Sequence, residues 1–315
     1  MRVFTNAEHL PAIRNPILTI GTFDGVHLGH QEIITTINQL AKEYDGESVI
    51  LTFHPHPRLV INPGDTSLKL INTLEEKKAL LAKYGVDNLI IVPFSREFSQ
   101  IPARQYVDDL IWKSIHPKVV VIGYDHRFGK NREGGIELIK AIGNERGFKV
   151  LEIEKQTVDD IDVSSTKVRA ALADCDIEQA NNLLGHHYTL EGIVVKGEQR
   201  GRKLGYPTAN IQVNDPNKLI PGNGIYAVNI VYAGAEFAGM MSIGTNPTFN
   251  NKKQTIEVYI FDFGKEIYGE ALKVIFVAYL RPEEKFDSIE ALIFQMQQDE
   301  LAAKNVLNYT HNQLP

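Results

Sequence analysis

The chain has 315 residues, 43% of them hydrophobic and 23% charged, so it can bury two domain cores without metals or disulfides. Its formal net charge of −6 argues against nucleic acid as a partner, and no apolar run approaches the roughly 20 residues that cross a bilayer. A single cysteine, Cys175, and an N-terminus without an apolar signal core favour a cytoplasmic protein.

The first half of the chain alternates short apolar runs with amphipathic windows. The apolar runs are rich in β-branched residues and bounded by Gly, Pro or Asp, which is typical of buried strands. Strands that alternate with helices predict an α/β fold with a doubly wound parallel sheet, which binds ligands at the carboxyl ends of its strands. The predicted strands are residues 17–20, 48–53, 89–94, 119–122 and 150–153, and the predicted helices are residues 31–41, 74–84 and 136–146.

The pattern changes after about Leu184, where strand-like runs follow one another with few helical windows between them. Short strands with Gly, Pro and Asn turns predict an antiparallel barrel or sandwich, and Ala233-Gly234 has the composition of a hairpin tip. A helix is predicted at residues 288–307, and a helical stretch at 167–184 connects the two halves. The predicted strands are residues 190–195, 225–232, 237–243, 255–260 and 272–279.

The sharpest local feature is Gly-Thr-Phe-Asp-Gly-Val-His-Leu-Gly-His, from Gly21 to His30, between a predicted strand and a predicted helix. Free backbone N–H groups at a helix start favour an anion, and glycines let a ligand approach the backbone. His27 and His30 can donate hydrogen bonds to phosphate and stabilise charge on a leaving pyrophosphate. Two alternatives are a capped turn with surface histidines, and a zinc site completed by the histidines of residues 53–57. The latter lacks the carboxylates or thiolates of a defined zinc spacing.

A second candidate for phosphate binding opens the predicted helix near residue 165. Ser164, Ser165 and Thr166 are followed by two cations, Lys167 and Arg169. One hydroxyl could simply cap the helix, with the cations solvated, but three hydroxyls and two cations at a helix start also fit a triphosphate.

The two motifs together are similar to those of the nucleotidylyltransferase superfamily. The first motif, with Phe-His-Pro-His-Pro at 53–57 and Gly-Tyr-Asp-His-Arg-Phe-Gly at 123–129, resembles the FAD synthetase module of bacterial bifunctional riboflavin kinase/FAD synthetases. The resemblance covers about residues 1–185. It implies direct attack by the FMN phosphate on the α-phosphorus of ATP, so the protein positions reactants and stabilises charge. The ATP-binding residues that it implies are Gly21, Phe23, Gly25, His27, His30, Asp125, Ser165, Thr166 and Arg169, with His27 and His30 as catalytic residues.

The second half has a basic, glycine-containing stretch from Arg200 to Ile211. Such a loop can wrap a polyphosphate with backbone N–H groups and side chains, although charged loops are also common on surfaces. Thr208 and Asn210 alternate along an extended chain and therefore point to the same side, where their oxygens could hold Mg²⁺.

This stretch, with its Pro-Thr-Ala-Asn motif, resembles the riboflavin kinase domain, as do the residues at 224–228, 242–249 and 280–283. The resemblance covers about residues 186–310 and implies a six-stranded antiparallel Greek-key β-barrel with a C-terminal helix. It also implies that Glu257 is the catalytic base, which takes the proton of the riboflavin 5′-hydroxyl. Spacing alone favours the alternative that Glu257 lies on the polar face of a half-buried strand, and only the resemblance singles it out. The ATP- or flavin-binding residues implied here are Gly201, Lys203, Gly205, Pro207, Thr208, Asn210 and Arg281.

Both halves, in the family's order, predict a bifunctional enzyme with an FAD synthetase (FMN adenylyltransferase) domain at 1–185 and a riboflavin kinase domain at 186–315. Its partners are riboflavin, FMN and ATP, its cofactor is Mg²⁺, and its expected state is a monomer or weak homo-oligomer. Two positions depart from the family pattern: His126 replaces an aromatic residue, and Tyr259 a frequent histidine. A chain in which only the kinase half works, and a flavin-binding sensor that consumes no ATP, are the alternative hypotheses.

Overall fold

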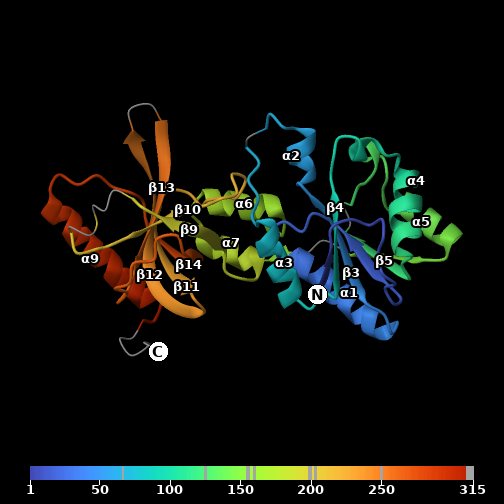
Figure 1. Cartoon of the computed structure of the whole chain (residues 1–315), viewed down its shortest axis with the longest axis horizontal. Coiled ribbons are helices and arrows are strands. Elements are labelled where there is room, and N and C mark those ends of the chain that lie inside the picture. The colour runs from blue at the N-terminus through green and yellow to red at the C-terminus, as the bar shows by residue number, and fades with distance from the viewer. Residues whose placement is uncertain are drawn as a thin grey trace. The chain divides into compact units, whose positions relative to one another are not determined.

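The computed structural model describes residues 1–65, 67–123, 126–153, 157–158, 161–197, 201, 204–248 and 251–309. The chain forms two compact units, which Figure 1 draws from blue to red along the sequence. We call residues 1–165 the sheet unit and residues 166–315 the barrel unit. Among the described residues, no helix is long and apolar enough to cross a membrane.

The sheet unit contains six parallel strands in the order β1-β4-β3-β2-β5-β6. The predicted doubly wound parallel sheet is thus confirmed. Because the chain runs from β2 outward to β4 and then returns to β5 on the other side of β2, the winding reverses between β2 and β5. Ligands bind outside the carboxyl ends of strands at such a point. The strands are Arg2–Phe4 (β1), Ile17–Ile20 (β2), Ser48–His54 (β3), Asn88–Pro93 (β4), Val119–Gly123 (β5) and Lys149–Ile153 (β6).

Helices cover both faces of this sheet, and alternate residues of each central strand enter two separate cores. Ile17 packs with α1 and α3, whereas Leu18, the next residue of β2, packs with η2 and α5 on the other face. Burial on both faces explains why the strands read as continuous apolar runs. The helical segments are Leu28–Glu43 (α1), Pro57–Ile61 (α2), Leu74–Lys83 (α3), Phe98–Gln100 (η1), Ala103–Gln105 (α4), Tyr106–Lys113 (η2, a π-helix), Lys130–Arg132 (η3) and Ile136–Arg146 (α5).

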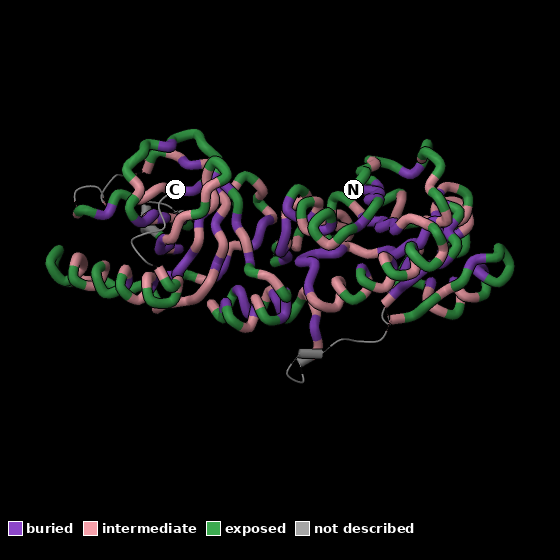
Figure 2. Tube along the Cα trace, turned by 90° about the horizontal axis from the view of Figure 1, so that it is seen from below, coloured by how far each residue is buried: buried purple, intermediate pink, exposed green. Residues whose placement is uncertain are grey.

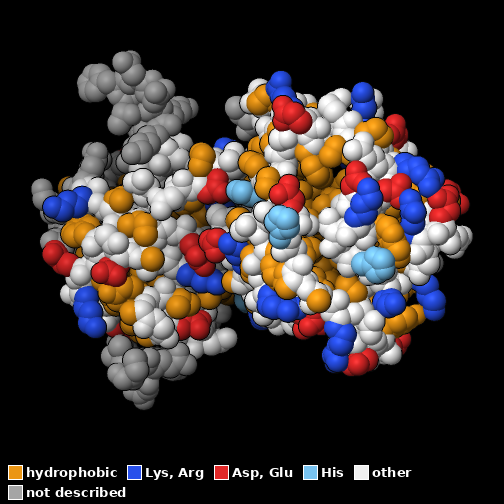
Figure 3. All heavy atoms as spheres, turned by 45° about the vertical axis from the view of Figure 1, so that its right-hand side comes forward, with side chains coloured by type: hydrophobic (Ala, Val, Ile, Leu, Met, Phe, Trp, Pro, Cys, Tyr) orange, Lys and Arg blue, Asp and Glu red, His pale blue; other side chains and the backbone are white. Residues whose placement is uncertain are grey.

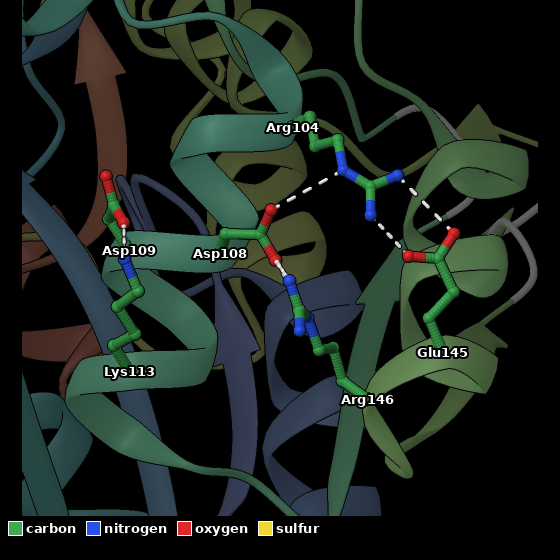
Figure 4. A network of polar contacts seen from close by, with 6 residues as sticks. All are labelled: Arg104, Asp108, Asp109, Lys113, Glu145 and Arg146. Atoms are coloured by element: carbon green, nitrogen blue, oxygen red, sulfur yellow. Dashed lines mark hydrogen bonds and ion pairs between the residues drawn. The ribbon is translucent and has the colours of Figure 1, made fainter.

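An ion-pair network joins the α4–η2 segment to α5 on the surface of the sheet unit (Figure 4). Arg104 pairs with Glu145 and, at 3.5 Å, with Asp108. Arg146 pairs with the same Asp108 at 2.8 Å. Exposed pairs of this kind each contribute only about 0–1 kcal/mol, so they orient α5 more than they stabilise it.

On the face drawn in Figure 3, basic and acidic side chains are interspersed rather than gathered by sign.

The barrel unit is a closed antiparallel barrel in the order β10-β13-β12-β11-β14-β9, as the resemblance predicted. The predicted hairpin tip lies between β11 and β12, where Ala233 and Gly234 both adopt positive φ angles of 49° and 83°. Figure 2 shows buried segments running through the barrel strands. The strands are Thr189–Val195 (β9), Ala209–Gln212 (β10), Gly224–Tyr232 (β11), Ala235–Thr248 (β12), Asn251–Ile260 (β13) and Ala271–Arg281 (β14).

Among the described residues, helices α6, α7 and α9 belong to the barrel unit, apart from Ser165 at the start of α6. Helices α6 (Ser165–Ala173) and α7 (Ile177–Leu184) occupy the predicted helical stretch at 167–184, and Cys175 between them adopts a φ of 63°. The compact units divide at residues 165 and 166, so all of α7 and nearly all of α6 lie in the barrel unit, whereas the predicted domain boundary follows residue 185. The predicted C-terminal helix is present as α9 (Ile289–Val306).

Candidate active sites

The turn after β2 has an unusual backbone. Phe23, Gly25 and Val26 all have left-handed φ angles, of 48°, 90° and 41°. A β-branched residue such as Val26 rarely adopts this region unless its surroundings hold it there. The Gly21 N–H donates to the Leu51 carbonyl at 3.0 Å, which attaches the start of the turn to β3. The structure thus bends the chain sharply at the carboxyl end of β2, where the sheet topology favours a ligand.

His27 and His30 meet at the start of α1. Their rings stack with centroids 3.7 Å apart, and Phe23 packs against His30 at 4.8 Å. His27 is only 6% exposed, which does not fit the alternative of two surface histidines. The buried Nδ1 of His30 has no hydrogen-bond partner among the described residues. Burial, and secondarily the charges of His27 and Lys77, hold the pKa of His30 well below its usual value, so this ring is neutral near pH 7.

The turn after β2 is held by hydrogen bonds of buried polar groups. The sequence did not single out these groups. The Asp24 carboxylate accepts hydrogen bonds from the Ile71 and Asn72 N–H groups, at 3.2 and 3.1 Å. The Thr22 carbonyl accepts one from the Lys77 ammonium group at 2.6 Å. A buried lysine on a helix looks like any surface lysine in a sequence, because nothing local reveals its burial.

Ser165 of the second predicted phosphate motif is hydrogen-bonded to the turn. The Ser165 hydroxyl donates to the Asp24 carbonyl oxygen at 2.9 Å. Thr166 and Arg169 lie on α6 within the barrel unit, and Asp125 lies outside the described residues. Among the residues that the structure describes, no three His, Cys, Asp or Glu side chains form a group that could hold a metal ion.

In the barrel unit, the structure brings together predicted residues from two distant motifs. The Thr208 hydroxyl donates to the Glu257 carboxylate at 2.8 Å. Asn210 on β10 lies directly opposite Glu257 on β13, so their side chains share one face of the barrel wall. All three residues are partly exposed. Two hard oxygen donors and a carboxylate therefore converge at an accessible position.

Glycines make room for this cluster. A Cβ atom on Gly197 would lie 2.3 Å from the Asn210 amide nitrogen, and one on Gly201 would lie 2.2 Å from the Tyr206 carbonyl oxygen. Gly205 has a φ of 83°, and Pro207 is exposed. Lys203 lies outside the described residues.

Arg281, which the resemblance implies as a ligand of ATP or flavin, is paired with an aspartate of α9. Its guanidinium group donates to both carboxylate oxygens of Asp299 on α9, each at 2.7 Å, and to the Pro282 carbonyl at 2.8 Å. The side chains of Arg281 and Asp299 are only 16% and 6% exposed. This pair links β14 to α9, and its binding of ATP or flavin stays a prediction.

Tyr259, at one of the two positions that depart from the family pattern, belongs to an aromatic cluster. Its ring meets Tyr206 edge to face at 5.0 Å and Phe261 at 5.7 Å. Burial, with the nearby Glu300 carboxylate, raises the pKa of Tyr206 to about 12. Burial also raises the pKa of Tyr259, so both tyrosines stay neutral near pH 7 and Tyr259 adds no charge beside Glu257.

Comparisons with known proteins find matches to both halves of the chain. The family model of FAD synthetase matches residues 10–167, and that of riboflavin kinase matches residues 184–307. Three similar proteins are each described as a bifunctional riboflavin kinase/FMN adenylyltransferase. The one from Listeria monocytogenes is 41% identical over 91% of this chain and 90% of its own length. Those from Bacillus subtilis and Escherichia coli are 36% and 34% identical, covering 91% and 93% of each chain.

A solved structure described as a macrolide-efflux protein from Streptococcus pneumoniae superposes with a TM-score of 0.88. It is 30% identical and covers 96% of this chain and 98% of that one. The matches to two family models define the class: a two-domain transferase with an FAD synthetase domain followed by a riboflavin kinase domain. More particularly, the chain belongs to the bifunctional riboflavin kinase/FMN adenylyltransferase family. The predicted family and enzyme class are confirmed.

Proposed function

We propose that this chain phosphorylates riboflavin with ATP to give FMN in the barrel unit. It then transfers the AMP group of a second ATP to FMN, giving FAD and pyrophosphate. In this second step, the His27–His30 pair is the main catalytic group. The observation that carries the kinase assignment is the convergence of Thr208, Asn210 and Glu257, because each matches a residue that the kinase chemistry requires.

In the kinase step, the 5′-oxygen of riboflavin attacks the γ-phosphorus of ATP, and the bond to the β–γ bridging oxygen breaks. Glu257 takes the hydroxyl proton, because a carboxylate can both orient the hydroxyl and accept its proton. Thr208 donates a hydrogen bond to this carboxylate and so holds it in one orientation.

The kinase cluster fits Mg²⁺, which takes oxygen ligands and keeps several waters. The Thr208 hydroxyl oxygen and the Asn210 amide oxygen would hold the ion beside Glu257. The Thr208 proton points to Glu257, which leaves the oxygen lone pairs available. When bound, the ion would neutralise charge on the ATP phosphates.

In the adenylylation step, a phosphate oxygen of FMN attacks the α-phosphorus of ATP, and pyrophosphate leaves. No base is needed, because a phosphate monoester has a second pKa of about 6 and is mostly ionised at neutral pH. His27 and His30 donate hydrogen bonds to the ATP phosphates from the start of α1. The remaining proposed ATP ligands are Gly21, Phe23, Gly25, Asp125, Ser165, Thr166 and Arg169.

A time course tests both steps. Purified protein is incubated with riboflavin, ATP and Mg²⁺, and the flavins are separated by chromatography. FMN that rises first, followed by FAD, supports the proposal. FMN alone would leave only the kinase half active, and tight flavin binding without ATP consumption would favour a flavin sensor.

We further propose that the enzyme works in the cytoplasm as a monomer or weak homo-oligomer, with domain limits of 1–185 and 186–315.

A further inference from the structure

One stretch of the sheet unit, residues 71–77, clamps the turn that carries the histidine pair. Its first two backbone N–H groups, from Ile71 and Asn72, bind the Asp24 carboxylate. Its last residue, Lys77, donates from its ammonium group to the Thr22 carbonyl at 2.6 Å. The same carbonyl accepts a longer hydrogen bond, of 3.3 Å, from the Thr52 hydroxyl. Two backbone donors and one cation from a single stretch therefore converge on the turn.

This clamp places two charged side chains inside the unit. Lys77 is 7% exposed and Asp24 is 2% exposed, although lysine is almost never buried unless it is paired. Burial lowers the pKa of Lys77, and the nearby Asp24 carboxylate opposes this shift and so favours the charged form of Lys77. A capping box formed by Thr73 and Glu76 fixes the start of α3 and hence the position of Lys77.

The turn requires such support because of its backbone. Phe23 and Val26 adopt left-handed φ angles that non-glycine residues keep only where the surrounding structure holds them. The Phe23 ring packs on His30, and His30 stacks on His27, so the geometry of the turn sets the position of both imidazoles.

We propose that Lys77 is a positioning residue for adenylyl transfer: it holds the Thr22 carbonyl so that the turn presents His27 and His30 as a stacked pair. This inference rests on the proposed role of the pair. Lys77 acts through the backbone of the turn, because its ammonium group is bound to a carbonyl oxygen inside the unit. Even a displacement of about 1 Å in a catalytic group can lower a rate about 100-fold.

The first test compares Lys77→Met with Lys78→Met. Lys78 is the next residue of α3 and donates only to the exposed Glu75, at 2.8 Å, among the contacts that the structure describes. In Lys77→Met, kcat for FAD formation from FMN should fall at least about 10-fold, with KM for ATP changed less than about threefold, because the histidines stabilise charge that develops in the transition state. Riboflavin phosphorylation by the same preparation and both activities of Lys78→Met should stay within about twofold of wild type.

A wild-type kcat for FAD formation in Lys77→Met, or an equal loss in Lys78→Met, would overturn the proposal. Because riboflavin phosphorylation belongs to the barrel unit, folding of the sheet unit in Lys77→Met is checked by hydrogen exchange of its amides. If their protection is lost, the variant has not folded, and Lys77→Arg decides instead. Because arginine keeps a cation that can donate to Thr22, this variant should retain FAD formation within about fivefold of wild type. A loss as large as that of His30→Gln, with the kinase step intact, would count against Lys77.

Nuclear magnetic resonance tests the positioning without any turnover. Stacked rings shift each other's proton signals. The His27 and His30 imidazole signals are assigned with His27→Gln and His30→Gln. In Lys77→Met or Lys77→Arg, these signals should move toward the chemical shifts of unstacked histidines only if the stack is disturbed. Lys77→Met should disturb it, and unchanged signals in that variant would reject the positioning role. Wild-type protein that forms no FAD would instead reject the proposed function, and the two failures are therefore distinguishable.

Discussion

The Thr208 hydroxyl donates a hydrogen bond of 2.8 Å to the carboxylate of Glu257, although 49 positions separate the two residues in the chain. Thr208 precedes β10, and Glu257 lies on β13, the strand paired with β10. The barrel thus brings a loop motif against a strand carboxylate.

Glu257→Gln should abolish the kinase step selectively. The amide keeps the shape of the side chain but cannot take the hydroxyl proton, so kcat for FMN formation should fall by a factor of about 100 to 10,000. FAD formation from supplied FMN should not change. Glu191→Gln is the matched control, because Glu191 lies on β9 with only a surface ion pair to Lys273 among its described contacts. A fully active Glu257→Gln enzyme would exclude Glu257 as the base.

Asn210→Ala should weaken the binding of Mg²⁺ in the kinase step rather than abolish the step. Losing one oxygen ligand should raise the Mg²⁺ concentration for half-maximal FMN formation on the order of tenfold or more. Gln212→Ala, on the exposed end of the same strand, should leave this concentration unchanged. Titration of initial rates with Mg²⁺ at saturating ATP measures it. Identical titrations for Asn210→Ala and wild type would remove Asn210 from the proposed ligand set.

The lowered pKa of His30 predicts a loss of stability in acid. In the unfolded chain His30 takes up a proton below its ordinary pKa of about 6.5, whereas in the folded chain it does so only at lower pH. The free energy of unfolding of the sheet unit should therefore keep its maximal contribution from His30 above about pH 6.5. It should decline as the pH falls toward the pKa of His30 in the folded chain, by at most about 1.4 kcal/mol per pH unit. Hydrogen exchange of sheet-unit amides measures this decline.

The control for this pH dependence is His30→Gln, in which the contribution of His30 is absent and the decline should be shallower. The same variant should lower kcat for FAD formation by a factor of about 100 to 1,000 if the ring donates to the ATP phosphates. Equal slopes for wild type and variant would mean that another group causes the acid sensitivity.

Arg281→Met should destabilise the barrel unit. It leaves the Asp299 carboxylate buried without its bidentate partner, and breaking a buried ion pair costs about 3–5 kcal/mol. Hydrogen exchange of barrel amides should show this loss. Arg146→Met removes a surface pair of the network in Figure 4 and should cost less than about 1 kcal/mol in the sheet unit. Similar costs for the two variants would contradict the importance of burial.

Much of the fold could be predicted from local sequence. The predicted strand at 119–122 and helix at 136–146 correspond to β5 and α5, because continuous β-branched runs and amphipathic periodicity reflect burial directly. Strand β1 escaped prediction, since Arg2–Phe4 is short and largely exposed, so its sequence carries no pattern of a buried strand. The predicted helical stretch at 167–184 contains two helices, α6 and α7, because Cys175 leaves the helical region between them.

The sequence by itself determined the order of the elements, the two motifs at helix starts and the membership of a family, because these depend on residue types at fixed spacing. Only the tertiary structure decided that Lys77 reaches the Thr22 carbonyl, that Arg281 pairs with Asp299, and that Thr208 meets Glu257. Such contacts join residues far apart in the chain. They depend on strand register and on which side of each helix is buried, and packing of the whole unit sets both.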